Sequence, residues 1–155
     1  MSEPGIPPAF AGRADDFYAW TQQQAEQLRL LQPERIDWQN LAEEIEDLGR
    51  SQKHKIESNL TIILLHLLKL AYRQATAKPG WKSAVIEHRR RIARILRDSP
   101  SLRRYPGAIL EEEYAGAREM AADETGLPEE TFPATCPFGI DAVLDPAFWP
   151  ESAAS

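Results

Sequence analysis

Hydrophobic and polar residues alternate with the period of an α-helix in four long stretches of the chain. Proline lacks a backbone N–H and clashes with the preceding helical turn, and it is absent from all four stretches. The proline-free stretches are residues 9–32, 34–78, 80–99 and 107–127. The pattern therefore predicts four main helices and no sheet.

Each predicted helix has an apolar face, and some of the helix ends are recognisable. The first helix is expected to begin at Asp15 or Asp16. Asp37 suits the N-cap of the second helix, and Gly126 suits the left-handed residue that closes the fourth. The expected faces comprise Phe17, Trp20, Gln24, Leu28 and Leu31 in the first helix, Trp81, Ala84, Val85, Ile92, Ile95 and Leu96 in the third, and Leu110, Tyr114, Ala117 and Ala121 in the fourth.

The second helix is unusually long, since it would span about 58 Å at 1.5 Å per residue. Two alternatives remain open: the helix breaks near Gly49, or it continues and packs against two partners in turn. We favour the continuous helix, because its apolar face shifts by about 75° between its two halves. The early face is Leu41, Ile45 and Leu48, expected on the first helix, and the later face is Ile56, Leu60, Ile63 and Leu67, expected on the third.

Residues 60–72 are apolar nearly all round and therefore predict the buried core. Residues 128–155 combine four aromatic side chains with five prolines, which indicates an extended strap over the bundle with a helical turn near 141–144. The predicted fold is thus an all-α bundle of four main helices around a long second helix, with an aromatic, Pro-rich C-terminal strap. We expect a flexible arm (1–14), a single domain (15–150) and a mobile C-terminus (151–155).

The amino-acid composition agrees with this fold and excludes some classes of protein. Alanine occurs 21 times and valine twice, which favours helices over strands. A single cysteine, Cys136, excludes a disulfide within one chain, and its proline and phenylalanine neighbours indicate structural burial. The chain begins without the pattern of a signal peptide, and its longest apolar run ends at His66. We therefore expect a cytoplasmic protein that does not enter a membrane.

A polar stripe interrupts the apolar second helix. It includes Asn59, His66, Lys69 and Arg73, and Glu44 lies near the same line if the helix is continuous. His88 lies on the apolar face of the third helix, where an antiparallel arrangement would bring it level with His66. Two imidazoles meeting in a core could bind a ligand or transfer protons. The structural alternative, which we favour, is that each histidine is buried and hydrogen-bonded to a neighbour.

The acidic run over residues 43–47 has a structural explanation, because acids early in a helix favour the positive end of its dipole. It lacks the Glu-x-x-His spacing of di-metal bundle proteins, so we predict neither a metal nor another cofactor.

Residues 78–104 carry nine basic and two acidic side chains, a local charge of +7 within a chain whose total is −6. The predicted basic surface of the third helix comprises Arg89, Arg90, Arg91, Arg94 and Arg97. Such a row could contact phosphates, although pairing with the acidic side chains or solvation is the favoured interpretation. The acidic total argues against non-specific binding of nucleic acid by the whole domain.

Several blocks of the sequence, in order, suggest a family. They are Asp16-Phe17-Tyr18-Ala19-Trp20, Asn40 to Gly49, His66-Leu67-Leu68-Lys69, Trp81, Ser99-Pro100-Ser101-Leu102, Phe132-Pro133, Cys136-Pro137-Phe138 and Leu144-Asp145-Pro146. Over roughly residues 15–150 the chain resembles the bacterial domain-of-unknown-function family 29. The resemblance implies a small all-α prokaryotic protein and supplies no activity, ligand or catalytic residue. Leu70 departs from the aromatic residue that relatives often have at this place.

Three functional hypotheses follow from these features. The first is a non-enzymatic helical interaction domain that binds a second copy of itself, as a homodimer, or another protein. The second is a small enzyme or ligand-binding domain that uses His66 and His88 with Glu44 or Asn59. The third is nucleic-acid binding through the basic third helix. The absence of a catalytic spacing and the separation of charge favour the first.

Overall fold

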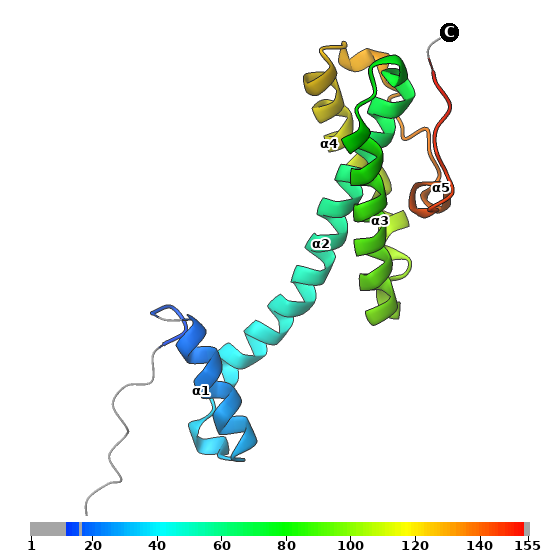
Figure 1. Ribbon diagram of the computed structural model, residues 1–155. Coiled ribbons are helices and arrows are strands. Elements are labelled where there is room, and N and C mark those ends of the chain that lie inside the picture. The colour runs from blue at the N-terminus through cyan, green and yellow to red at the C-terminus, as the bar shows by residue number, and fades with distance from the viewer. Residues whose placement is uncertain (1–11, 16, 154–155) are drawn as a thin grey trace, which may run out of the picture. The chain divides into compact units, whose positions relative to one another are not determined.

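The computed structural model describes residues 12–15 and 17–153, and every regular element in these ranges is helical (Figure 1). No helix within them is long and apolar enough to cross a membrane. The all-α fold predicted from the sequence is confirmed. The α-helices are α1 (Phe17–Arg29), α2 (Trp38–Tyr72), α3 (Pro79–Asp98), α4 (Tyr105–Thr125) and α5 (Ile140–Leu144), with 3₁₀ turns η1 (Pro33–Arg35), η2 (Gln74–Thr76), η3 (Pro100–Leu102) and η4 (Glu129–Thr131).

The chain forms two compact units, Met1–Arg50 and Ser51–Ser155. Helix α2 contributes residues to both and is uninterrupted at Gly49, so the continuous alternative is confirmed. Most of the predicted flexible arm (1–14), the alternative cap Asp16 and the last two residues of the predicted mobile C-terminus lie outside the described residues, as does the side chain of Phe17. The single domain expected over 15–150 stays a prediction.

In the first unit, Asp37 both caps α2 and joins it to α1. Its Oδ1 accepts the backbone N–H of Asn40 at 3.4 Å, which confirms the predicted N-cap. The backbone N–H of Asp37 donates to Gln24 Oε1 at 2.8 Å, and Trp20 Nε1 donates to Asp37 Oδ2 at 3.5 Å. The helix start is therefore held by side chains from the neighbouring helix as well as by its own.

The predicted apolar face of the first helix is wrong at its C-terminal end. Helix α1 ends at Arg29, and Leu31 adopts a positive φ of 53°, so it cannot continue the helical stripe. Leu28 and Leu31 are both exposed. Among the described residues of this unit, Trp20 is the single buried hydrophobic side chain, accompanied by the buried amides of Gln24 and Gln27.

The early apolar face of α2 also differs from its prediction. Ile45 is 60% exposed and Leu48 is 66% exposed, although both were expected to pack on the first helix. The reason is that polar residues of α2, and not these apolar ones, make the contacts with the rest of the first unit. Asn40, Glu43 and Glu44 share contacts with Asp37 and Arg13, and these contacts leave Ile45 and Leu48 uncovered within the unit.

The second unit contains the main core, which α2, α3 and α4 form together. The predicted core segment of α2 is buried almost throughout, from Leu60 to Ala71. Val85 and Ile92 cover it from α3, and Tyr114, Ala117 and Ala121 cover it from α4, as the helical spacing predicts. Gly126 closes α4 with a φ of 71°, which confirms the predicted left-handed cap.

The predicted strap is also present, and α5 lies where the helical turn was expected. Phe132 and Val143 are fully buried in the core, and the Phe132 ring meets Tyr72 edge-on at 5.0 Å. Because the strap is mostly irregular, its carbonyl groups need donors from elsewhere. The Tyr114 hydroxyl donates to Pro133 O at 2.5 Å, and the Arg118 guanidinium donates to Phe132 O at 3.1 and 3.2 Å.

Two glycines should respond to alanine in opposite directions. Gly49 lies in the middle of α2, where an added Cβ meets nothing within 4 Å, so G49A should stabilise by about 0.5–1 kcal/mol. Gly126 has equal space but a positive φ, so G126A should destabilise by about 1 kcal/mol. Urea unfolding followed by circular dichroism measures both. Shifts of the same sign in the two variants would contradict the assigned backbone conformations.

Candidate functional site

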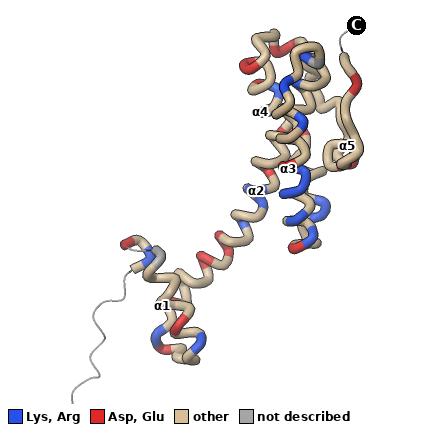
Figure 2. The backbone as a smooth tube through the Cα atoms, in the orientation of Figure 1, with Lys and Arg blue, Asp and Glu red and all other residues tan. Residues whose placement is uncertain are grey.

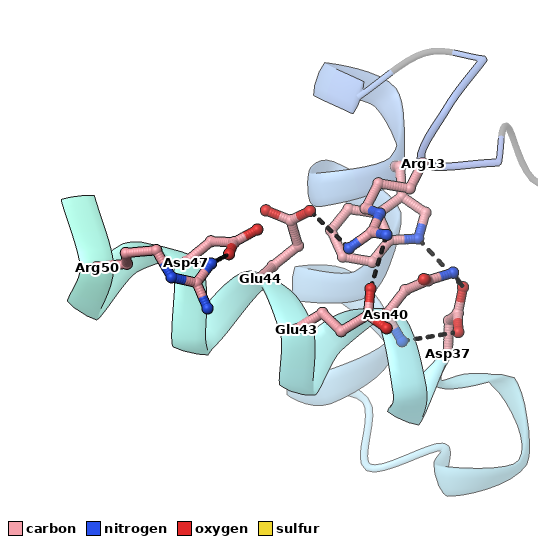
Figure 3. Close-up of polar contacts among 8 residues, drawn as sticks. Arg13, Asp37, Asn40, Glu43, Glu44, Asp47 and Arg50 are labelled. Carbon is pink, nitrogen blue, oxygen red and sulfur yellow. Dashed lines mark hydrogen bonds and ion pairs between the residues drawn. The ribbon is translucent and has the colours of Figure 1, made fainter.

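The acidic run of α2 belongs to a polar cluster in the first unit (Figure 3). Arg13 bridges two of its members, donating from Nη2 to Glu43 at 2.8 Å and from Nη1 to Glu44 at 2.9 Å. The hydrogen bond to Glu43 is the largest cause of the raised pKa of Arg13, and the bond to Glu44 adds to it. The side chain of Asn40 donates to the carboxylate of Asp37 and thereby lowers its pKa. Glu44, a predicted member of the histidine site, thus has its ion-pair partner within the first unit.

The second unit brings Asn59 and His88 together. His88 Nδ1 lies 2.5 Å from Asn59 Oδ1, while His66 Nδ1 lies 2.9 Å from the carbonyl oxygen of Ile62. Both partner atoms are acceptors, so each Nδ1 carries the hydrogen and each Nε2 has a free lone pair. Among the described residues, no protein group hydrogen-bonds either Nε2.

Burial keeps both imidazoles neutral. It is the largest cause of the lowered pKa of His66, with a smaller contribution from Lys69. Burial also lowers the pKa of His88, followed by repulsion from Arg91, and His66 itself contributes. The effect of His66 on the pKa of His88 is the smallest of these causes. Chemically, the arrangement offers two lone pairs that can accept a proton or a hydrogen bond.

The remaining cations of the polar stripe point to other partners. Lys69 is 8% exposed, and its Nζ lies 2.8 Å from Glu124 Oε2 and 4.6 Å from the ring centroid of Trp81. Arg73 Nη2 donates to the carbonyl oxygen of Thr125 at 3.1 Å, at the C-terminal end of α4 where a cation is favourable. These two side chains join α2 to α3 and α4.

Over the range that the structure describes, no three His, Cys, Asp or Glu side chains are grouped so that they could hold a metal ion. Cys136 donates from Sγ to Phe138 O at 3.3 Å, and burial raises the pKa of its thiol. A raised pKa disfavours the reactive thiolate. The thiol of Cys136 thus forms a hydrogen bond within the strap.

Arg89 corrects the predicted basic surface, because it is 4% exposed. Its Nε donates to Val143 O at 2.8 Å and its Nη2 to Ala142 O at 3.4 Å, and its guanidinium lies 5.1 Å from the ring centroid of Trp149. The physical reason is its position on α3, about 40° from buried Val85 in projection. Arg89 therefore anchors the strap to α3 by satisfying the last carbonyls of α5.

The other four predicted arginines are exposed. Arg91 pairs with Glu87 at 2.5 Å across one helical turn. Arg90 and Arg94 have no acidic partner within the described part of the chain. An open hollow beside them is lined by Ser83, Ile86, Glu87, Arg90, Arg91 and Arg94. The fifth member, Arg97, lies in the last turn of the same helix.

Sequence reasoning missed the partners that α4 supplies to α2. Glu113 Oε2 accepts the Thr61 hydroxyl at 2.6 Å, and Glu124 accepts from Lys69. These pairs join residues more than fifty positions apart, and their register depends on how the helices pack. The sequence shows a lysine within an apolar segment and several acidic residues in α4, but it does not show which of them pair.

A family model described as "Domain of unknown function DUF29" matches residues 14–149 of the chain. No curated protein and no solved structure shows significant similarity to it.

The lowered pKa values of His66 and His88 predict that acid weakens the second unit. Both folded pKa values lie below the ordinary value near 6.5, so the contribution to stability is complete above pH 6.5 and is lost as pH falls through the folded pKa values. NMR titration of the imidazoles should give both midpoints below 6.5. The variant H66Q/H88Q should lose less stability than the wild type between pH 7.5 and 5. Midpoints at or above 6.5 would contradict this burial.

The buried Arg89 predicts a strap that loosens on substitution. R89A removes two charge-assisted hydrogen bonds, and it takes away the side-chain donor of Val143 O, so it should destabilise by about 2 kcal/mol. Urea unfolding measures this loss, and limited proteolysis should cut the strap sooner. R90A, an exposed neighbour, is the matched control and should change stability by no more than about 0.5 kcal/mol. Equal effects of both variants would contradict the anchoring role.

Proposed function

Since the chain belongs to the DUF29 family, whose function is unknown, we propose a function from the geometry: it is a non-enzymatic helical interaction domain. The first unit supplies the binding face, and a second copy of the chain is the partner. The proposal includes a cytoplasmic setting, in keeping with a single cysteine.

The supporting observation is where the exposed large hydrophobic side chains lie. Of the eight such side chains among the described residues, six belong to the first unit. Trp38, Ile45 and Leu48 lie on one side of α2 by their helical spacing, with exposures of 58%, 60% and 66%. The other members are Leu28, Leu30 and Leu31 of the first unit and Ile86 and Met120 of the second.

The first unit has little core of its own to offset this exposure. Trp20 is its one buried hydrophobic side chain among the described residues. Units this small bury a modest share of their surface and are marginally stable, so a partner that covers apolar side chains adds stability. Neighbouring exposed apolar residues in such a unit are typical of a protein interaction site. Covering Trp38, Ile45 and Leu48 with a second protein surface therefore stabilises both the unit and the complex.

The histidine pair supports a second candidate, the binding of a small ligand in the second unit. Its one favourable observation is the fixed tautomer, which leaves the Nε2 atoms of His66 and His88 without protein partners among the described residues. The Nδ1 bond of His88 to Asn59 also joins α3 to α2, and that of His66 to Ile62 lies within α2. We therefore rank this candidate below the interaction domain.

Sedimentation velocity at micromolar concentration tests the proposed function. The wild-type chain should sediment as a dimer, and I45Q/L48Q should sediment as a monomer because the apolar contact is lost. M120Q, which changes an exposed apolar residue of the second unit, is the matched control and should remain dimeric. A wild-type chain that stays monomeric up to 100 times that concentration would refute the proposal.

A further inference from the structure

Charge is divided unequally along the chain. Residues 1–50 carry ten acidic and four basic side chains, so they account for the entire net charge of −6. Residues 51–155 carry fourteen of each sign and sum to zero, yet residues 78–104 within them carry +7. Figure 2 shows these Lys and Arg residues along α3 and the turn that follows it. The first unit and α3 are therefore electrostatically complementary surfaces.

The α3 surface also has an apolar recess. A pocket of about 200 Å³ lies between α3 and the strap. Its walls are Ile86, Arg89, Arg90, Ala93, Leu144 and Pro146. Ile86 is 48% exposed, and Arg90 at the rim continues to Arg94 one turn further along the helix. An apolar recess with an unpaired basic rim suits an acidic surface that presents a large apolar side chain.

The first unit presents such a surface. Trp38, Ile45 and Leu48 are its exposed apolar side chains on α2. Glu34 and Glu46 are exposed and lie close to this row in the sequence, and neither has an ion-pair partner in the described part of the chain. Trp38 lies beside η1, with its Nε1 donating to Pro33 O at 3.0 Å, which holds the indole next to Glu34.

We infer that the first unit of one copy docks on the α3 and strap surface of a second copy. The partner's first unit docks in the same way on the first copy, so that two equivalent contacts form a closed dimer with two-fold symmetry. One apolar side chain of the Trp38, Ile45 and Leu48 row enters the pocket, and acidic side chains of the first unit face Arg90 and Arg94. This inference rests on the proposed function and names the surface that receives the binding face.

The apolar contacts supply affinity, and the charges supply orientation and rate of association. Ion pairs at the rim are exposed and are screened over about 10 Å at 0.1 M salt. Dimerisation should therefore weaken with salt but persist, since the pocket contact does not depend on ionic strength. Nucleic-acid binding through the same arginines would instead be lost steeply as salt rises.

A charge swap between two full-length variants tests the inference. R90E/R94E makes the receiving surface acidic, and E34R/E46R makes the docking surface basic. Each variant alone should dimerise at least tenfold more weakly than the wild type in sedimentation velocity, because like charges then meet. An equimolar mixture of the two variants should form dimers with an affinity close to that of the wild type. In the mixed dimer each docking surface contacts a receiving surface of opposite charge. Native mass spectrometry should identify the recovered species as the heterodimer.

The control is R103E/R104E, which makes the same change in charge on exposed arginines beyond α3. It should dimerise like the wild type, and circular dichroism should show all variants folded. A wild-type dimer that I45Q/L48Q dissociates but R90E/R94E does not would overturn the inference and leave the proposed function standing. Variants that weaken dimerisation without recovery on mixing, or an equal effect in the control, would also overturn it. A monomeric wild type would overturn both.

Discussion

The apolar segment of α2 from Leu60 to Ala71 is the constraint on which the second unit depends. It is apolar on nearly all sides, so covering one face leaves others in water. Each buried leucine or isoleucine contributes roughly 1.5–3 kcal/mol relative to an exposed one. Helices α3 and α4 cover much of its surface, and the strap adds Phe132 and Val143 to the same core. The need to surround one helix thus accounts for the C-terminal strap.

Polar groups within this core determine how its elements are aligned. The strap has little regular structure, so its carbonyls accept hydrogen bonds from Arg89, Tyr114 and Arg118. Asn59 binds His88 of α3, and Lys69 binds Glu124 of α4. Each contact joins α2 or the strap to a particular position on a neighbouring helix. Apolar packing gives the unit its stability, and these bonds fix its register.

The features that depend on local sequence pattern, namely the helices and their ends, could be predicted from the sequence. Proline positions and helical periodicity predicted the four main helices, and glycine at position 126, which has no Cβ, indicated the left-handed cap. Arg89 was assigned to the surface because of its charge, although its projection beside Val85 indicated burial. Leu31 was misplaced because the backbone turns there with a positive φ, a conformation that leucine rarely adopts. Leu28 lies within α1 but is exposed, although its spacing predicted burial. The long-range partners of Lys69 and Thr61 could not be predicted, since they depend on tertiary register.

The strap has a consequence for the behaviour of the protein in concentrated solution. Helices release their hydrogen bonds cooperatively, whereas the strap is held by side-chain bonds and a few backbone bonds, such as that from Ala153 N to Ala71 O at 2.7 Å. Opening of this segment is therefore the low-energy fluctuation of the second unit. Each such opening uncovers the most apolar part of the molecule while the helices persist. Aggregation should accordingly begin from a nearly native, fully helical species rather than from the unfolded chain.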